Sequence, residues 1–138
     1  MKKKIFIASD HAGFELKTNL NNHFSFLIDL GTNSNESVDY PDFAHKLTKE
    51  ILNNTESIGI LICGSGVGMS IAANRDSNIR AGLVHKAEIA KLIRQHNDAN
   101  VLVLPGRFID VQEAIKCVEN FLNTEFESGR HKKRIDKI

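Results

Sequence analysis

The chain has 138 residues, which suits one domain with one well-buried core. Its 18 Lys and Arg nearly cancel its 17 Asp and Glu, and a net charge of +1 gives no general reason to expect nucleic acid or an acidic membrane as a partner. No apolar run approaches transmembrane length, and the run after residues 1–4 is too short for a signal peptide. We therefore expect a cytoplasmic protein of one domain over 1–138, with a basic tail over 124–138.

Short apolar runs alternate with longer amphipathic stretches along the whole chain. In chain order we expect a strand over 5–9, a helix over 14–24, a strand over 26–30, a helix capped by Asp42, a strand over 58–62, a helix over about 68–74, a strand over 80–84, a helix over 87–95, a strand over 101–104 and a helix over 111–122. On the helix after Asp42, the apolar side chains expected to face inward are Ala44, Leu47, Ile51 and Leu52.

This alternation predicts an α/β fold: a parallel sheet of five strands covered by helices on both faces. Right-handed crossovers make it a three-layer, doubly wound, Rossmann-like fold, for which we expect the strand order 2-1-3-4-5. Ligands bind such folds where the winding direction reverses, beyond the carboxyl ends of the strands. Here the reversal lies between strand one, which ends at Asp10 and His11, and strand three, which ends at Cys63. The fold alone thus brings these segments into one crevice.

The segment 64–68 is a glycine-rich turn between a strand and a helix. Such a turn presents backbone N–H groups to an anion. The spacing GxGxG differs from the dinucleotide fingerprint GxGxxG, and Val84 and His85 stand where an acidic ribose ligand is needed. No Gly-Lys-Ser/Thr follows, so a Walker loop is excluded as well. An oxyanion or small-phosphate site is the favoured interpretation, and a purely structural tight turn is the alternative.

Several other residues allow both a chemical and a structural interpretation. Cys63, at the helix N-terminus, is either a nucleophile or general base, or a filler at the end of a buried strand. The pair Asp10-His11 alone is better explained as a helix cap with a surface histidine. Arg130 and Arg134 lie four residues apart, so on a helix they share a face and could clamp a phosphate, although a solvated basic tail is the usual outcome.

Metal and disulfide signatures are not found. The six histidines show no HExxH or comparable ligand spacing, and the two cysteines do not form a CxxC pair. We therefore expect no metal site. We also expect no disulfide between Cys63 and Cys117 in a reducing compartment, and Cys117 is a small core residue by its helical spacing.

Taken together, five segments resemble the ribose-5-phosphate isomerase B family, which includes the galactose-6-phosphate isomerase subunits. The resemblance spans essentially the whole chain, and the five segments occur in the family's order. The matching segments are 9–13 (SDHAG), 39–42 (DYPD), 59–74 (GILICGSGVGMSIAAN), 94–100 (RQHNDAN) and 129–131 (GRH) with Arg134.

This resemblance implies an isomerase that interconverts ribose 5-phosphate and ribulose 5-phosphate through a cis-enediolate, without metal or cofactor. Cys63 would be the base that moves a proton between C1 and C2. Relatives without this cysteine use a glutamate six positions later, where this chain has Met69. Ser65 would move protons at the sugar oxygens, in place of the family's usual threonine. The turn whose N–H groups would hold the enediolate oxygen consists of Gly64, Ser65, Gly66, Val67 and Gly68.

For the rest of the substrate, the resemblance implies that His96, with Asp10 nearby, assists opening of the furanose ring. Asn97 would contact the sugar and Tyr40 would line the pocket. The residues implied in phosphate binding are His11, Arg107, Arg130 and Arg134.

The fold adds a consequence for assembly. His96 and Asn97 precede strand five and so lie at the amino-terminal edge of the sheet, whereas Asp10 and Cys63 lie at the carboxyl edge. One subunit can hardly bring both pairs to one substrate. We therefore expect a homodimer or homotetramer with shared active sites, and no activity from a monomer.

Two other functions remain open from the sequence. The motifs handle C1, C2 and phosphate alike, so a six-carbon phosphate such as galactose 6-phosphate or allose 6-phosphate is an alternative substrate. A non-catalytic sugar-phosphate-binding module, in which Cys63 is inert, is the alternative from a different class. A nucleic-acid-binding role for the basic tail is disfavoured by the near-neutral net charge.

Overall fold

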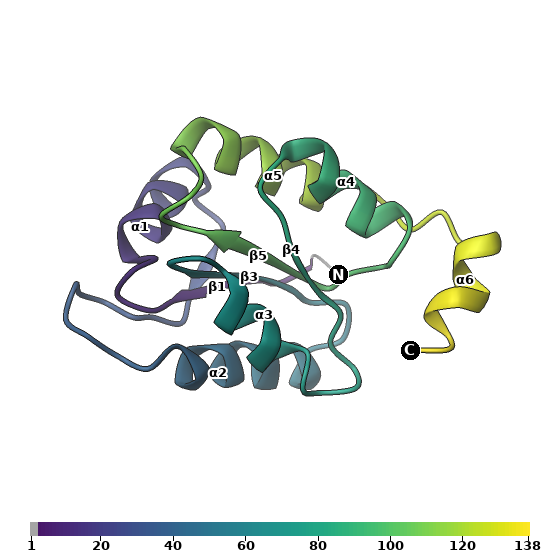
Figure 1. The fold of residues 1–138 in the computed structure, drawn as a ribbon, viewed down its shortest axis with the longest axis horizontal. Helices are drawn as coiled ribbons and strands as arrows, with labels where there is room; N and C mark the ends of the chain where they lie inside the picture. Colours follow the sequence, from purple (N-terminus) through teal and green to yellow (C-terminus); the bar gives the residue numbers. More distant parts are fainter. Residues whose placement is uncertain (1–2) are drawn as a thin grey trace.

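The computed structural model describes residues 3–138 and places the apolar runs side by side in one parallel sheet (Figure 1). Its strands are β1 (Ile5–Ser9), β2 (Ile28–Asp29), β3 (Ile58–Cys63), β4 (Ala81–Leu83) and β5 (Val101–Pro105). Its helices are α1 (Phe14–His23), α2 (Tyr40–Asn53), α3 (Val67–Ala73), α4 (Ala87–Gln95), α5 (Val111–Asn123) and α6 (Arg130–Ile135). The predicted five-stranded, doubly wound α/β fold is confirmed.

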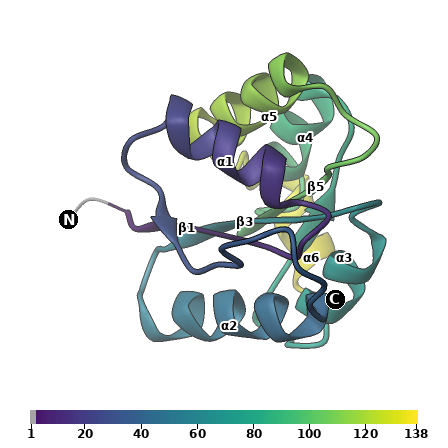
Figure 2. The ribbon, with the colours of Figure 1, turned by 90° about the vertical axis from the view of Figure 1, so that its left-hand side faces the viewer.

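The sheet separates two apolar clusters because successive strand residues point to opposite faces. On β3, Ile60 and Ile62 face the cluster beneath α1, α4 and α5, while Leu61 and Cys63 face the cluster above α2 and α3. Figure 2 shows these three layers edge-on. Every residue of β3 is buried, as expected of a central parallel strand.

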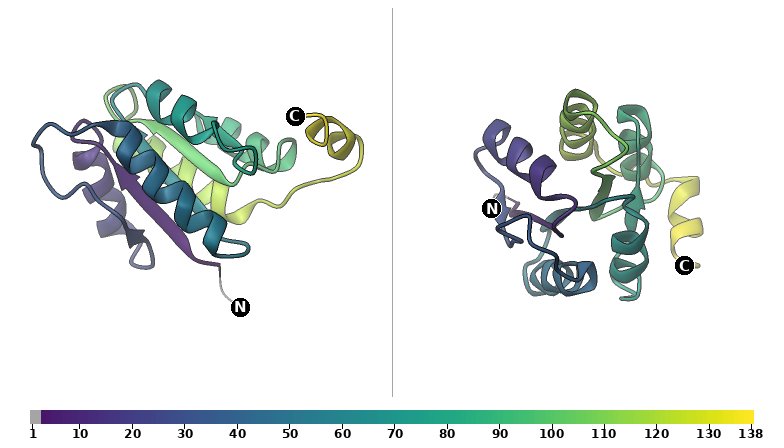
Figure 3. Two further views of the ribbon diagram at one scale, coloured as in Figure 1. Left: turned by 90° about the horizontal axis from the view of Figure 1, so that it is seen from below. Right: turned by 60° about the vertical axis from the view of Figure 1, so that its left-hand side comes forward.

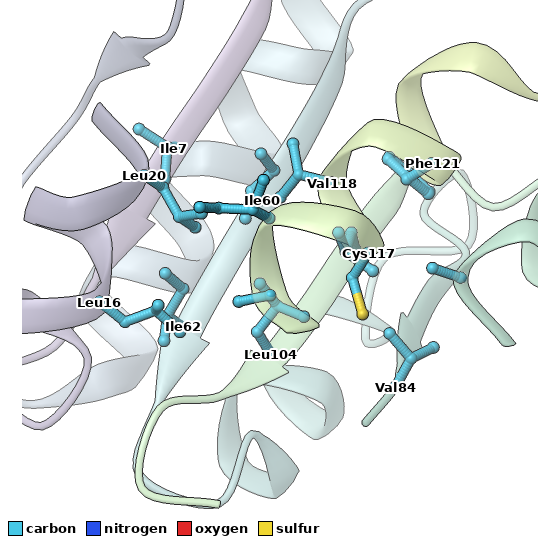
Figure 4. Close-up of a cluster of buried hydrophobic side chains, with 14 of the residues drawn as sticks. Ile7, Leu16, Leu20, Ile60, Ile62, Val84, Leu104, Cys117, Val118 and Phe121 are labelled. Carbon is cyan, nitrogen blue, oxygen red and sulfur yellow. The ribbon is translucent and has the colours of Figure 1, made fainter. Parts of the chain in front are cut away.

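Cys117 belongs to the larger cluster, where it packs among Val84, Leu104 and Phe121 (Figure 4). Its side chain is fully buried, which agrees with its predicted place in the core. Both cysteines are free thiols.

The observed strand order is β2-β1-β3-β5-β4, so the predicted order is wrong in its last two strands. β5 is apolar and buried along its whole length and takes the inner place beside β3. β4 is only three residues long, is half-buried, and forms the edge. The step back from β4 to β5 also explains why α4 lies on the face of α1 and α5, since a right-handed crossover that reverses direction changes face (Figure 1).

Three local predictions need correction. Helix α2 begins at Tyr40 with Asp39 as its N-cap residue, so Asp42 lies in the first turn; Pro41 favours this earlier start. Leu52 does not face inward, since 45% of its surface is exposed. The second strand is shorter than predicted, with only Ile28–Asp29 paired to β1 at the sheet edge.

The basic tail ends in the short helix α6, which stands away from the sheet on the side where the strands begin (Figures 1 and 3). His131 and Ile135 are buried on it, whereas Arg130 and Arg134 are exposed. Among residues 3–138, no helix is long and apolar enough to cross a membrane.

Candidate active site

The carboxyl ends of β1 and β3 open into a crevice of about 460 Å³. It lies at the predicted position, where the winding direction of the sheet reverses. The residues that line it and that the sequence singled out are Asp10, His11, Tyr40, Cys63, Gly64, Ser65, Val67, Gly68 and Arg107. Ala12 and Ile71 complete the lining.

Cys63 is the last residue of β3 and reaches this crevice from the core. Only 4% of its surface is exposed, and it also packs in the cluster on the side of α2 and α3. Its carbonyl accepts the N–H of Gly106 at 2.8 Å, and the carbonyl of Gly64 accepts the N–H of Arg107 at 2.9 Å. These two hydrogen bonds tie the start of the glycine-rich turn to the end of β5.

The turn itself requires glycine at one position above all. Gly66 has a φ of +79°, which residues with a side chain rarely adopt, and a Cβ there would overlap Leu83. Helix α3 begins at the next residue, Val67, whose N–H donates to the hydroxyl of Ser65 at 3.2 Å. A ligand that uses this N–H therefore competes with the Ser65 hydroxyl.

Asp10 and His11 are both engaged by backbone groups. The Asp10 carboxylate, which is buried, accepts the N–H of Gly13 at 3.0 Å and so closes the turn before α1 in addition to lining the crevice; the N-cap residue of α1 is Gly13 and not Asp10. His11 Nδ1 accepts the N–H of Val38 at 3.1 Å. An accepting Nδ1 places the proton of the neutral imidazole on Nε2, which leaves that nitrogen as a donor.

Two long side chains close over the glycines of the turn. The Tyr40 ring lies so near Gly68 that a Cβ there would come within 2.5 Å of it. The Arg107 guanidinium would lie 3.3 Å from a Cβ at Gly64. A Cβ at Gly68 would force the Tyr40 ring to move, whereas one at Gly64 would need only a small shift of the Arg107 side chain, which places its positive charge at the crevice.

A second cavity of about 520 Å³ adjoins the first and shares its lining residues His11, Ala12 and Arg107. Asn35, in the polar loop before α2, lines this extension, as do Glu15 and Asp110. The sequence does not mark these three residues as parts of a site, because they come from separate loops and helix starts that only the fold brings together.

Of the other predicted site residues, Gly66 lies within the turn without lining the crevice, and four lie elsewhere. Asn97 lines a separate cavity of about 420 Å³ beside the edge strand β4, and His96 ends α4. Arg130 and Arg134 are exposed on α6. None of these four residues lines the crevice. The five residues of β5 separate the two edges of the sheet by roughly 16 Å of extended strand.

The His96 ring stacks on the ring of His131, with centroids 4.3 Å apart and planes 15° from parallel. Burial lowers the pKa of His131, and so do the neighbouring His96 and Arg130; Glu127, 3.6 Å away, acts in the opposite direction. The sequence did not reveal this pair, since 35 residues separate its members in the chain.

His96, Glu127 and His131 hold three potential metal ligand atoms within 4.8 Å of one another, the one such group found in residues 3–138. Because the His96 and His131 rings are stacked and nearly parallel, the lone pairs of their nitrogens lie in parallel planes and do not converge on one point. The positive charge of Arg130 also stands close by. The arrangement fits stacked imidazoles better than it fits a metal centre.

Comparison with known proteins gives the family. The model of the ribose/galactose isomerase family matches residues 5–138. A probable ribose-5-phosphate isomerase B of Mycoplasma pneumoniae is 48% identical, over 100% of this chain and 94% of the relative. The crystal structure of a ribose 5-phosphate isomerase of Thermotoga maritima superposes with a TM-score of 0.95 at 52% identity, covering 99% of this chain and 97% of that one.

A further structure, the ribose-5-phosphate isomerase B of Mycoplasma genitalium with bound ribulose-5-phosphate, has a TM-score of 0.94 at 45% identity. The match covers 99% of this chain and 94% of that chain. The chain described here belongs to the ribose/galactose isomerase family.

Proposed function

We propose that this chain is an aldose-ketose isomerase that interconverts ribose 5-phosphate and ribulose 5-phosphate through an enediolate, as a step of the pentose phosphate pathway. The observation that carries the proposal is the crevice, in which Cys63 and the glycine-rich turn face the same space as His11 and Arg107. The thiol is placed to act as a base on the reacting carbons and the turn to bind their oxyanion, while the two basic side chains are suited to bind the phosphate. Relatives of near-equal length carry the same activity in their names.

In the isomerisation step, the Cys63 thiolate removes the proton from C2 of the open-chain aldose, and the electron pair moves through C1 to the carbonyl oxygen. Backbone N–H groups of the turn Gly64–Gly68 stabilise the negative charge on this oxygen. Ser65 carries the proton of the C2 hydroxyl to the oxygen on C1. Return of the proton from Cys63 to C1 completes the ketose, with no net change in the enzyme.

Ring opening precedes this step because ribose 5-phosphate is mainly a furanose in solution. The C1 hydroxyl loses a proton and the ring oxygen gains one as the bond between C1 and the ring oxygen breaks. We assign this proton transfer to His96 with Asp10, contact with the sugar to Asn97, and the lining of the pocket to Tyr40. Arg130 and Arg134 join His11 and Arg107 on the phosphate.

These assignments require two copies of the chain, since His96, Asn97, Arg130 and Arg134 lie far from the crevice of their own subunit. Exposed apolar side chains beside the crevice support an interface there: Val67 is 49% exposed and Ile71 62%. We propose a homodimer or homotetramer whose active sites are shared. Sedimentation of the active species at 15.4 kDa would contradict it.

The free thiols and the sugar-phosphate chemistry suit a reducing compartment, so we propose the cytoplasm as the site of action. The overall charge of +1 supports a small phosphorylated substrate as the partner and neither nucleic acid nor a membrane.

The direct test is conversion of ribose 5-phosphate by chelator-treated protein, with Cys63→Ala beside it and Cys117→Ala as the matched control. We expect turnover by the native protein and by Cys117→Ala, and its collapse in Cys63→Ala. Turnover that survives in Cys63→Ala would show that Cys63 is not the base. No turnover by the native protein leaves two alternatives, a six-carbon substrate such as galactose 6-phosphate or allose 6-phosphate and a non-catalytic sugar-phosphate-binding module, which assays with those sugars separate.

A further inference from the structure

The short segment between α4 and β5 carries His96 and Asn97 and has an unusual backbone. Asp98, the next residue, has a φ of +48°, in the left-handed region that non-glycine residues seldom enter. Its N–H donates to the carbonyl of Arg94 at 3.2 Å and so closes the end of the helix. His96 and Asn97 are therefore held between the helix, where the His96 N–H donates to the carbonyl of Leu92 at 2.8 Å, and the left-handed turn at Asp98.

The N–H of Ala99 closes the same turn on the carbonyl of Ile93 at 3.0 Å, and two arginines bind the Asp98 carboxylate. One Asp98 carboxylate oxygen accepts from Arg94 at 3.0 Å, and the other accepts from Arg80 at 3.2 Å. Arg80 also donates to the carbonyls of Asn97, at 2.8 Å, and Asp98, at 3.1 Å. The Asp98 carboxylate is thus the common acceptor that joins Arg80, before β4, to Arg94, in the last turn of α4.

Arg94 is buried, and its further hydrogen bonds go to the carbonyls of Ala99 at 2.7 Å and Thr124 at 3.2 Å. The last of these contacts reaches the segment that leads to α6. Charge-assisted hydrogen bonds of this kind are stronger than neutral ones, and Arg94 would lose its paired anion without Asp98. The carboxylate therefore links α4, the start of β4 and the chain that leads to His131, the stacking partner of His96.

We propose that Asp98 is a positioning residue for ring opening. By joining Arg80 and Arg94, its carboxylate fixes the left-handed turn that aims His96 at the substrate of the neighbouring subunit. This inference rests on the proposed function and assigns a role to a residue that touches neither the substrate nor the reacting atoms.

The two halves of the reaction provide a readout that a general loss of structure would not give. Ribulose 5-phosphate has a ketone at C2 and a phosphate on its C5 oxygen, so it cannot form a furanose. Exchange of its C1 hydrogen with deuterium from solvent needs enediolate formation at Cys63 and no ring opening. Net conversion of ribose 5-phosphate needs both. Loss of a residue that acts through His96 therefore slows the conversion of ribose 5-phosphate and leaves the C1 exchange of ribulose 5-phosphate unchanged.

The variant for the test is Asp98→Asn, because asparagine keeps the size of the side chain and tolerates the left-handed region. At saturating substrate, we expect conversion of ribose 5-phosphate to fall by about 10²-fold, the lower end of the usual general acid-base contribution. We expect C1 exchange on ribulose 5-phosphate to stay within about twofold of native, since no acid-base group of that step is removed. His96→Ala should reproduce this pattern, and Cys63→Ala should lose both activities.

The matched control is Glu119→Gln, which removes one negative charge from an exposed position of α5 and should leave both activities unchanged. Arg80→Gln removes the partner of Asp98 in the ion pair and should change the two activities as Asp98→Asn does. The test therefore stays valid where one of the two variants fails to fold. Equal loss of both activities in the two variants, or no loss in either, overturns the positioning role. A native protein with neither activity refutes the proposed function instead.

Discussion

The two buried cysteines differ in their access to the crevice. Burial and the neighbouring Glu113 raise the pKa of the Cys117 thiol to about 12. At neutral pH this thiol is almost entirely protonated and is enclosed in the core, so it is a poor nucleophile. Cys63 is also buried, but it lines the crevice and can be reached from it.

Iodoacetamide near neutral pH is therefore expected to modify the native protein at Cys63 and to spare Cys117. Bound ribulose 5-phosphate should protect Cys63, because the proposed function places the sugar in the same crevice. Intact mass and peptide mapping give the number and position of adducts. Labelling of Cys117 at the rate of Cys63, or no protection by the sugar phosphate, would contradict this account of the two thiols.

The lowered pKa of His131 makes stability depend on pH. An unfolded histidine takes up its proton near pH 6.5, whereas folded His131 resists protonation until the pH is lower. Between these two values the unfolded chain binds more protons, so the free energy of unfolding falls as the pH falls. The stacked pair His96–His131 is the part of the molecule that acid should weaken.

We expect the native protein to lose more thermal stability between about pH 7.5 and about pH 5.5 than His131→Gln does, because the variant has no imidazole to protonate. His85→Gln, at an exposed histidine, is the control and should keep the native pH dependence. Melting temperatures at the two pH values decide the matter. Equal losses in the native protein and in His131→Gln would refute the assignment to His131.

At the scale of elements, the turn between β3 and α3 depends on the left-handed conformation of Gly66. Gly66→Ala should destabilise the protein by more than the about 1–2 kcal/mol of left-handed strain, since the new Cβ also overlaps Leu83. Gly129→Ala gives a comparison without overlap, because Gly129 also has a positive φ and has nothing within 4 Å of its Cβ position, although its ψ of −131° differs from the −15° of Gly66. Denaturant unfolding gives both free energies. A loss for Gly66→Ala no larger than about 1–2 kcal/mol, the strain of the left-handed conformation alone, would contradict the packing argument.

The helices and strands also show how much of the fold could be predicted from the sequence. Strand β1 and helix α4 have the predicted bounds, and the crevice lies where the predicted sheet reverses its winding, because apolar periodicity and turn residues are local signals. The order of β4 and β5 was missed, since it depends on which strand buries more apolar surface in the finished sheet. The stack of His96 on His131 and the ion pair of Asp98 with Arg80 could not be predicted for a similar reason, since the partners come from distant parts of the chain.

At the scale of the whole molecule, the candidate site residues fall into two groups. Cys63, Ser65 and Arg107 lie at the crevice, where the strands end. His96 and the α6 arginines lie toward the opposite edge, where the strands begin (Figure 3). A two-fold axis that places one edge against the other generates two equivalent complete sites, each built from both chains.

Mixing two inactive variants tests this central claim most directly. Cys63→Ala and His96→Ala are unfolded together in equal amounts, refolded, and assayed for conversion of ribose 5-phosphate. A shared site predicts that mixed dimers contain one intact site, so that about a quarter of the native activity returns with random pairing. Activity that stays at the level of the separate variants, in a mixture shown to contain mixed dimers, would contradict a site built from Cys63 of one chain and His96 of the other.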